Sequence, residues 1–352
     1  MMPPLADPSD LRRAARRGLL LAAVWPALAL LGLGIAAKLP LYDDLLAQVR
    51  AARPLEALGA IVAFVLVFPA MGLRWRALLP GAKEAKVGAV AISAVAASGQ
   101  LVGIALPGPV GELAAASLVR RRWAIPGPIA LAASLHARVL GLLTGVLMAA
   151  VLLAGAPGVT VPANWGLPLL LGGAAVSGMV GALTALALFP ALFLRIQPPA
   201  WLPSPAARLW ALVAEFLEGA SQLGRGVGRP HAEAALWSLV MHACAGIGVF
   251  LLARALGGEP SLGGVLFTQG AISAGALVLF LLPGQALGSD AAYATFLIGA
   301  SGLDPGVAVV TTALARAAQT LLMALGPALV GVDLARVDLE PKALQAADEE
   351  AM

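Results

Sequence analysis

Long apolar runs separated by short polar stretches extend through the whole chain. An α-helix rises about 1.5 Å per residue, so roughly 20 apolar residues cross a hydrocarbon core of about 30 Å. Runs near that length predict membrane helices at residues 18–37, 55–73, 87–105, 128–154, 166–194, 235–252, 262–282 and 305–332. The pattern therefore predicts an all-α fold, a polytopic membrane helical bundle.

The polar stretches set the predicted domain boundaries. Residues 1–17 form a basic N-terminus, residues 18–332 a single transmembrane domain, and residues 333–352 a polar, acidic tail. Inside the domain, residues 195–233 form a polar linker in which Ser204-Pro205 has the form of a helix N-cap followed by proline. Apolar residues then recur at helical spacing, which predicts an amphipathic helix at the membrane interface. A plain linker packed on the bundle explains the same residues.

One phrase occurs twice within the apolar runs. Residues 106–112 read Leu-Pro-Gly-Pro-Val-Gly-Glu, and residues 282–290 read Leu-Pro-Gly-Gln-Ala-Leu-Gly-Ser-Asp. Each copy ends on a carboxylate, and an arginine follows that carboxylate 26 residues later. The acid and arginine are Glu112 with Arg138 in the first copy, and Asp290 with Arg316 in the second. The equal offset indicates an internal repeat, whose copies lie at about 87–154 and 262–332.

Each Leu-Pro-Gly is expected to end a helix inside the apolar region, because proline removes a backbone donor and glycine loosens the chain. The helix-breaking residues are Pro107 and Gly108 in the first copy and Pro283 and Gly284 in the second. Backbone groups freed at membrane depth are tolerated only where protein or a water-filled cavity satisfies them. Broken helices at corresponding positions of two halves indicate a transport site. Simple kinks, which are common in membrane helices, are the alternative.

Composition and charge agree with a membrane protein and exclude other classes. The chain is 60% hydrophobic and 12% charged, whereas soluble domains carry about 25% charged residues. The net charge of +4 does not indicate nucleic acid binding, because the basic residues flank apolar runs. Cys244 is the single cysteine, and the three histidines lack the spacing of metal ligands. We therefore expect no metal, no cofactor and no nucleic acid partner.

The basic residues also predict an orientation. Seventeen of the 23 Lys and Arg lie on one side of the predicted spans, four lie on the other side, and Arg138 and Arg316 lie inside apolar runs. Cytoplasmic loops are enriched in Lys and Arg, so both termini are expected in the cytoplasm. The two broken hairpins then start from opposite sides of the membrane, which makes the copies inverted repeats. Charge counting fits re-entrant hairpins and fully crossing ones equally well.

Four ionisable residues fall inside the apolar region. A charged group at the bilayer centre costs about 2.5–3.5 kcal/mol on insertion scales, so its presence there suggests a function. We therefore predict that Glu112, Arg138, Asp290 and Arg316 bind substrate as acid–arginine pairs. Gln100 and Gln285 are further candidates, because their amides could donate to a phosphate or satisfy a neighbouring backbone group. The alternative is that the pairs only fix helix register.

No combination of residues indicates catalysis. The sequence has no Gly-rich phosphate loop, nucleophile elbow or paired His ligands. We therefore expect a protein that is not an enzyme.

The quoted motifs resemble a known family. The segment from Ser98 to Glu112, Leu-His-Ala-Arg-Val-Leu-Gly-Leu-Leu around Arg138, the second Leu-Pro-Gly copy and Arg316 are similar to the flippase-like transmembrane domain of lysylphosphatidylglycerol synthases. The resemblance covers nearly the whole chain and implies a stand-alone member without the soluble aminoacyl-transferase domain. It further implies a multi-pass protein of a bacterial inner (plasma) membrane that translocates a phospholipid or other lipid-linked substrate between leaflets.

The chain departs from the family pattern at several charged positions. Pro109, Ala115, Ala137 and Gly141 stand where the family usually or often has charged residues, and Ser289-Asp290 replaces Arg-Glu. The resemblance therefore does not fix the lipid. The expected partners are membrane lipids, with a lipid-modifying enzyme as a further candidate. The alternative function is a non-transporting membrane subunit, or accessory, of a lipid- or glycan-modifying enzyme.

Overall fold

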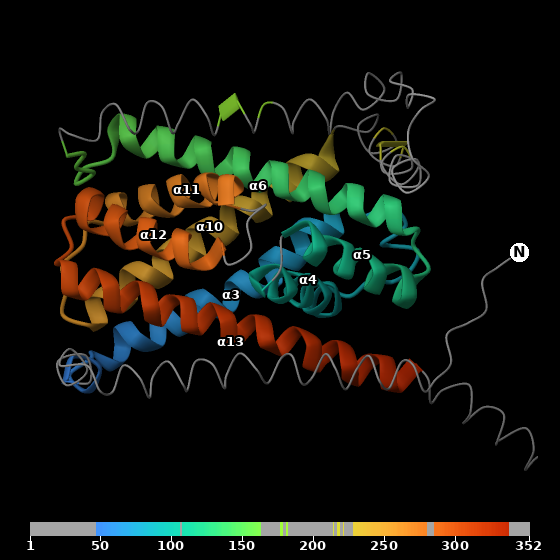
Figure 1. Ribbon diagram of the computed structural model, residues 1–352, viewed down its shortest axis with the longest axis horizontal. Helices are drawn as coiled ribbons and strands as arrows, with labels where there is room; N and C mark the ends of the chain where they lie inside the picture. The colour runs from blue at the N-terminus through green and yellow to red at the C-terminus, as the bar shows by residue number, and fades with distance from the viewer. Residues whose placement is uncertain are drawn as a thin grey trace, which may run out of the picture.

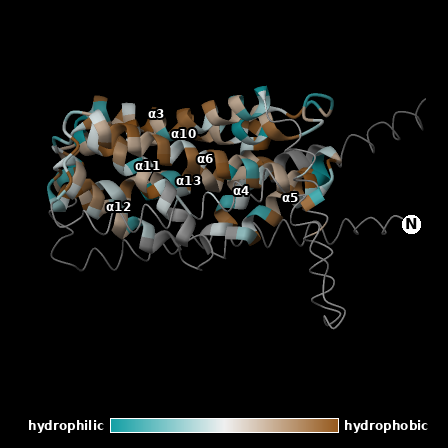
Figure 2. Ribbon diagram, turned by 90° about the horizontal axis from the view of Figure 1, so that it is seen from above, coloured by the Kyte–Doolittle hydropathy of each residue, from teal (hydrophilic) through white to brown (hydrophobic). Residues whose placement is uncertain are grey.

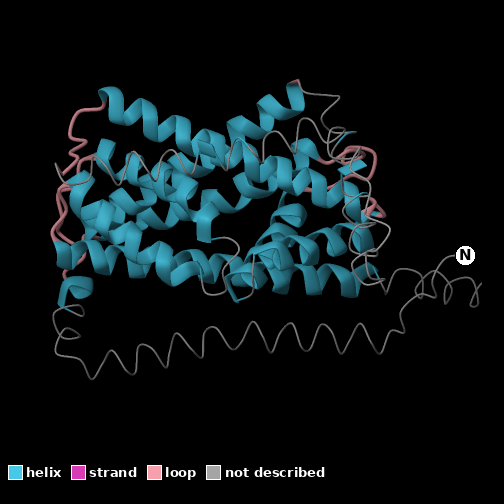
Figure 3. Ribbon diagram, turned by 45° about the horizontal axis from the view of Figure 1, so that its top comes forward, coloured by secondary structure: helices cyan, strands magenta, loops and turns pink. Residues whose placement is uncertain are grey.

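The computed structural model describes residues 47–105, 108–162, 228–279 and 285–337, with a few isolated positions between 177 and 221. Within these ranges the chain consists of helices joined by short loops, without strands (Figure 3). The all-α prediction is therefore confirmed. The predicted N-terminus and first span, the span at 166–194, most of the linker at 195–233, and residues 338–352 lie outside the described residues.

The described helices follow the predicted apolar runs, apart from α5 and α12, which come directly after the Leu-Pro-Gly motifs. They are α3 (Pro54–Leu78), α4 (Ala89–Ala105), α5 (Gly108–Trp123), α6 (Gly127–Gly155), α10 (Arg229–Ala255), α11 (Leu262–Leu279), α12 (Gln285–Ser301) and α13 (Pro305–Val337). Three ends lie five or six residues beyond the prediction. The helix α3 continues five residues past the predicted end at residue 73, α10 begins six residues before residue 235, and α13 continues past residue 332.

These differences have a common physical reason. Polar residues at the ends of an apolar run do not stop a helix, since Arg and Glu are good helix formers. Proline in the first turn also favours a helix start, and Pro230 occupies this place in α10. The arginines Arg74 and Arg76, which we assigned to a flank, therefore lie inside α3.

Several helices have the length and surface of membrane spans. The helices α3, α6 and α10, and residues Pro305–Val330 of α13, are long and apolar enough to cross a membrane. Large apolar side chains point outward, with Leu55 81% exposed on α3 and Leu147 63% exposed on α6. Hydrophilic residues gather mainly towards the two ends of the bundle (Figure 2). A surface of this kind fits lipid and not water.

The helices next to the Leu-Pro-Gly motifs are shorter and form two hairpins. They contain 16 to 18 residues each, which at about 1.5 Å per residue falls short of a core of about 30 Å. The hairpin of α4 and α5 lies at one end of the bundle, and the hairpin of α11 and α12 lies at the other (Figure 1). In each pair the two helices pack against each other, so the described chain turns back between them. Such opposed hairpins are what inverted repeats predict, and the inverted relation itself stays a prediction.

The described helices of each hairpin lie on either side of a Leu-Pro-Gly motif. The helix α4 ends at Ala105 and α5 begins at Gly108, while α11 ends at Leu279 and α12 begins at Gln285. Gly108 is thus the first residue of α5. Pro107, Pro283 and Gly284 lie outside the described residues.

The two halves are interlocked by close backbone contacts. The helix α6 of the first half packs on α11 of the second, where a Cβ at Gly270 would lie 2.6 Å from the carbonyl oxygen of Gly145. The helix α13 of the second half packs on α4 of the first, where a Cβ at Gly326 would lie 2.6 Å from the carbonyl oxygen of Ala94. Small residues allow helices to approach this closely in membranes. Each hairpin is therefore supported by the long helix of the other half.

Candidate functional site

The first acid–arginine pair joins α5 to α6. Arg138 Nε–H donates to Glu112 Oε1 at 3.1 Å, and Arg138 Nη2 donates to the same oxygen. Ser134 lies one turn before Arg138 on α6, and its hydroxyl donates to Glu112 Oε2. Both carboxylate oxygens of Glu112 thus have a partner.

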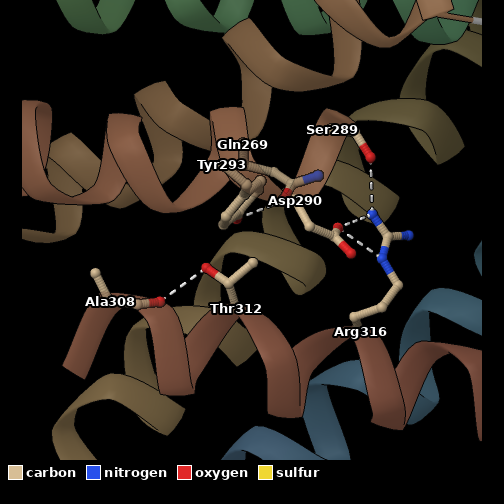
Figure 4. A network of polar contacts seen from close by, with 7 residues as sticks. All are labelled: Gln269, Ser289, Asp290, Tyr293, Ala308, Thr312 and Arg316. Atoms are coloured by element: carbon tan, nitrogen blue, oxygen red, sulfur yellow. Dashed lines mark hydrogen bonds and ion pairs between the residues drawn. The ribbon is translucent and has the colours of Figure 1, made fainter. Parts of the chain in front are cut away.

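The second pair joins α12 to α13 in the same way (Figure 4). Arg316 Nε–H donates to Asp290 Oδ1 at 2.8 Å, and Arg316 Nη2 donates to the same oxygen. The Nη2 group also donates to Ser289 Oγ at 3.2 Å. The guanidinium therefore binds two neighbouring residues of α12.

The structure forms the pairs that the sequence suggests, each within its own half. Glu112 pairs with Arg138 in the first half, and Asp290 pairs with Arg316 in the second. The side chains remain partly exposed, at 19% for Glu112, 29% for Arg138, 26% for Asp290 and 32% for Arg316. A partly exposed ion pair can exchange partners more easily than a fully enclosed one, because the released groups are not left unsatisfied.

A small cavity adjoins the first pair. Its volume is about 30 Å³, and its polar lining comes from Arg74, Gln100, Glu112, Ser134 and Arg138. Gln100 therefore lies at the predicted site. A cavity needs roughly 10–15 Å³ to hold one water molecule, so this one holds about two and not a lipid headgroup. The side chain of Gln285 is not among those described.

Arg74 is the residue of this site that sequence reasoning missed. It comes directly after the predicted span at 55–73, whereas the structure places it in α3, where it lines the cavity. Its Nε is buried and has no hydrogen-bond partner among the residues that the structure describes. The available signal was helical spacing, because Arg74 follows Phe64 and Met71 on the buried face of α3.

The guanidinium of Arg74 reaches α6 where that helix has no side chain. A Cβ at Gly141 would lie 2.5 Å from Arg74 Nη1. Gly141 is three residues after Arg138, so the two lie on the same face of α6. Arg74 and Arg138 thus approach the cavity from different helices.

The second site has neutral groups beside its ion pair. Tyr293 O–H donates to Gln269 Oε1 at 2.8 Å, and Gln269 Nε2 donates to Ser273 Oγ at 3.0 Å. Figure 4 shows Gln269 and Tyr293 next to Asp290. The first site therefore contains two arginines and one acid, whereas the described part of the second contains one of each.

The histidines connect helices near the first site. His136 Nδ1 and His231 Nε2 lie 3.3 Å apart, and His242 Nε2–H donates to the carbonyl oxygen of Gly141 at 2.8 Å. Among the described residues, no group of three His, Cys, Asp or Glu side chains could hold a metal ion.

The family of the chain follows from a comparison with known proteins. Residues 15–326 match the family described as the lysylphosphatidylglycerol synthase TM region. The chain belongs to this family. No curated protein and no solved structure gives a match. All four charged residues of the two pairs lie within the matched range, so the site is part of the lysylphosphatidylglycerol synthase TM region itself. The suspected family is confirmed, and with it a membrane protein.

Proposed function

We propose that this chain translocates a phospholipid or another lipid-linked substrate between the leaflets of a cell membrane. The observation that carries the proposal is the pair of partly exposed acid–arginine contacts, Glu112 with Arg138 and Asp290 with Arg316. Each contact lies just after a helix break, and the two hairpins lie at opposite ends of the bundle (Figure 1). Broken helices of this kind surround the substrate sites of secondary transporters.

The chemistry of the pairs suits a polar headgroup crossing an apolar core. A guanidinium donates two parallel hydrogen bonds to a phosphate, and a carboxylate accepts from hydroxyl or amino groups. An arriving headgroup would replace the contacts that Glu112 and Arg138 make with each other. The charges then stay satisfied with and without substrate.

The interlocked halves suit alternating access. The α4–α5 hairpin rests on α13, and α11 of the other hairpin rests on α6. Rocking one half against the other would open each hairpin to its own side. In this proposal the protein lies in the inner membrane with both termini in the cytoplasm, uses membrane lipids as substrate, and is not an enzyme.

A non-transporting membrane subunit of a lipid- or glycan-modifying enzyme is the second candidate. The small volume of the cavity, about 30 Å³, favours it. In that case the ion pairs fix the register of neighbouring helices and bind nothing.

A reconstitution experiment separates the two candidates. The full chain and the variants Glu112→Gln and Asp290→Asn are placed in liposomes, and movement of fluorescent phospholipids between leaflets is measured. We expect both variants to fold and insert but to lose translocation, because an amide does not provide the charge that the guanidinium and headgroup require. Arg76→Gln, which removes a charge from α3 outside the cavity lining, serves as the control and should translocate normally.

Two results would contradict the proposal. Translocation by both variants at the wild-type rate would mean that the carboxylates are not the site. The helix-register role would be correct if both variants failed to accumulate and Glu112→Gln combined with Arg138→Gln restored folded protein. Loss of one partner of a buried pair typically costs about 3–5 kcal/mol, whereas loss of both costs less.

A further inference from the structure

The first site has a surplus positive charge. Arg74, Arg138 and Glu112 line one cavity, which gives two guanidinium groups and one carboxylate. Both oxygens of the carboxylate are already bound, one by Arg138 and the other by Ser134. Among the described residues, Arg74 forms no ion pair or hydrogen bond through its side chain. The formal charge of the site is therefore +1.

The fold holds this surplus charge in place. The Nε of Arg74 is buried without a partner, and its Nη1 packs against the backbone of α6 at Gly141. Burying an unpaired charge costs free energy unless a counter-charge or a metal satisfies it. The carboxylate that lines the cavity is already bound by Arg138 and Ser134, so an anion would balance the second guanidinium.

We propose that Arg74 and Arg138 together bind the phosphate of an anionic lipid headgroup, so that the site selects lipids whose phosphate is not balanced by a cation of their own. Arginine binds phosphate through a planar fork of donors. A headgroup that carries its own cation would place that cation beside the surplus guanidinium. The inference rests on the proposed function, since it names the substrate class of the same site.

Entry of a phosphate requires the site to open. The cavity of about 30 Å³ has room for about two water molecules. The α4–α5 hairpin supplies Gln100 and Glu112 to its lining, and α3 supplies Arg74. Movement of the hairpin away from α3 and α6 would enlarge the cavity and leave both guanidinium groups on the remaining wall.

The test compares two labelled lipids that share a phosphodiester. Phosphatidylglycerol has an unbalanced phosphate, whereas phosphatidylcholine carries a cation of its own. We expect wild-type protein in liposomes to move phosphatidylglycerol about tenfold faster, a factor equivalent to about 1.4 kcal/mol. Arg74→Gln should slow phosphatidylglycerol by about the same factor and leave phosphatidylcholine unchanged, which removes the preference.

Two further variants control for charge and folding. Arg76→Gln removes an equal charge from the same helix without touching the cavity, so both rates should be unchanged. Gly141→Ala keeps every charge but displaces the Arg74 guanidinium, because the new methyl would occupy its position. This variant should also reduce the preference for phosphatidylglycerol. If Arg74→Gln does not fold, Gly141→Ala alone tests the inference. A preference that survives both Arg74→Gln and Gly141→Ala would overturn the inference, as would equal losses for the two lipids.

Binding in detergent separates this inference from the proposed function. The thermal stability of the purified full chain is measured with dihexanoyl phosphatidylglycerol and with inorganic phosphate. Stabilisation by the short-chain lipid that requires Arg74 supports the anion site even if no lipid is translocated, in which case only the proposed function fails. Translocation without a charge preference would support the proposed function and contradict this inference. Equal, Arg74-dependent stabilisation by inorganic phosphate would overturn the assignment to a lipid headgroup.

Discussion

At the residue scale, the two ion pairs differ in whether a nearby hydroxyl group donates to the carboxylate. Ser134 and Thr312 each lie four residues before the arginine of their pair. The hydroxyl of Ser134 donates to Glu112, whereas the hydroxyl of Thr312 donates to the carbonyl oxygen of Ala308 in its own helix at 2.8 Å. The carboxylate of Glu112 is therefore held from two directions. Asp290 is held by Arg316, which also binds Ser289.

This difference predicts unequal effects of removing the two hydroxyls. Hydrogen bonds to charged groups contribute about 1.5–3 kcal/mol when buried, and a partly exposed bond contributes less, about 1 kcal/mol. Ser134→Ala should lower thermal stability in detergent and reduce lipid translocation, because Glu112 loses a donor. Thr312→Val is the matched control, since it removes a hydroxyl that serves only its own helix, and should leave translocation unchanged. Equal effects of both variants on translocation would show that Ser134 does not position the carboxylate.

At the scale of elements, glycine sets how closely the hairpin helices approach. A Cβ at Gly99 on α4 would lie 2.7 Å from the carbonyl oxygen of Gly111 on α5, and a Cβ at Gly111 would overlap the carbonyl oxygen of Gly99. The second hairpin has the same feature, because a Cβ at Gly264 on α11 would overlap the backbone of Ala300 on α12. Backbone-to-backbone contact of this kind leaves no flexible group that could move aside.

A single methyl group should therefore separate α4 from α5. Overpacking in a tightly packed interior typically costs about 1–3 kcal/mol, so Gly111→Ala should lower the midpoint of thermal unfolding and displace Glu112. Gly275→Ala on α11 is the control, because no atom of the described residues lies within 4 Å of a Cβ built there. Alanine at that position should be neutral or stabilising, since it favours helix over glycine by about 1 kcal/mol. Wild-type stability of Gly111→Ala would mean that the hairpin is looser than its backbone contacts indicate.

At the scale of the whole molecule, hydrogen bonds gather three loops at one end of the bundle. Arg53 N–H donates to the carbonyl oxygen of Ala255 at 2.9 Å, Thr160 N–H to that of Ala300 at 3.2 Å, and Ser261 N–H to that of Ser301 at 3.1 Å. Figure 1 places the loops after α3 and α5 at the opposite end. Those loops carry or adjoin Lys83, Lys86 and the arginines at 120–122, so the positive-inside rule predicts that their end is cytoplasmic.

Cysteine labelling tests this orientation. With Cys244→Ala as background, Pro157→Cys and Lys83→Cys each introduce one exposed thiol, at the opposite ends of the bundle. A membrane-impermeant maleimide added to intact spheroplasts should label Pro157→Cys, and should label Lys83→Cys only after the membrane is opened. The reversed pattern would invert the orientation. Labelling of both positions from one side would contradict a bundle whose long helices cross the membrane.

The sequence by itself determined the features that depend on local order along the chain. The apolar runs predicted the long helices that the structure describes, because a helix in lipid must satisfy its own backbone groups. The Leu-Pro-Gly motifs predicted where each hairpin divides into two helices, since proline and glycine act on the residues next to them. The equal offset from Glu112 to Arg138 and from Asp290 to Arg316 predicted both ion pairs. The sequence did not place the ends of α3 and α10, because polar residues can continue a helix.

Only the tertiary structure decided which side chains meet across helices. Arg74 appears in the sequence as one more basic residue after an apolar run, yet it reaches the first site because α6 has a glycine at position 141. The contact of His136 with His231 spans 95 positions of the chain. Helical spacing places Arg74 on the buried face of α3, but neither contact can be read from the sequence, since each depends on how closely two separate helices pack. The surplus charge of the first site therefore depends on how the helices pack. The positions of the charged residues in the sequence do not reveal it.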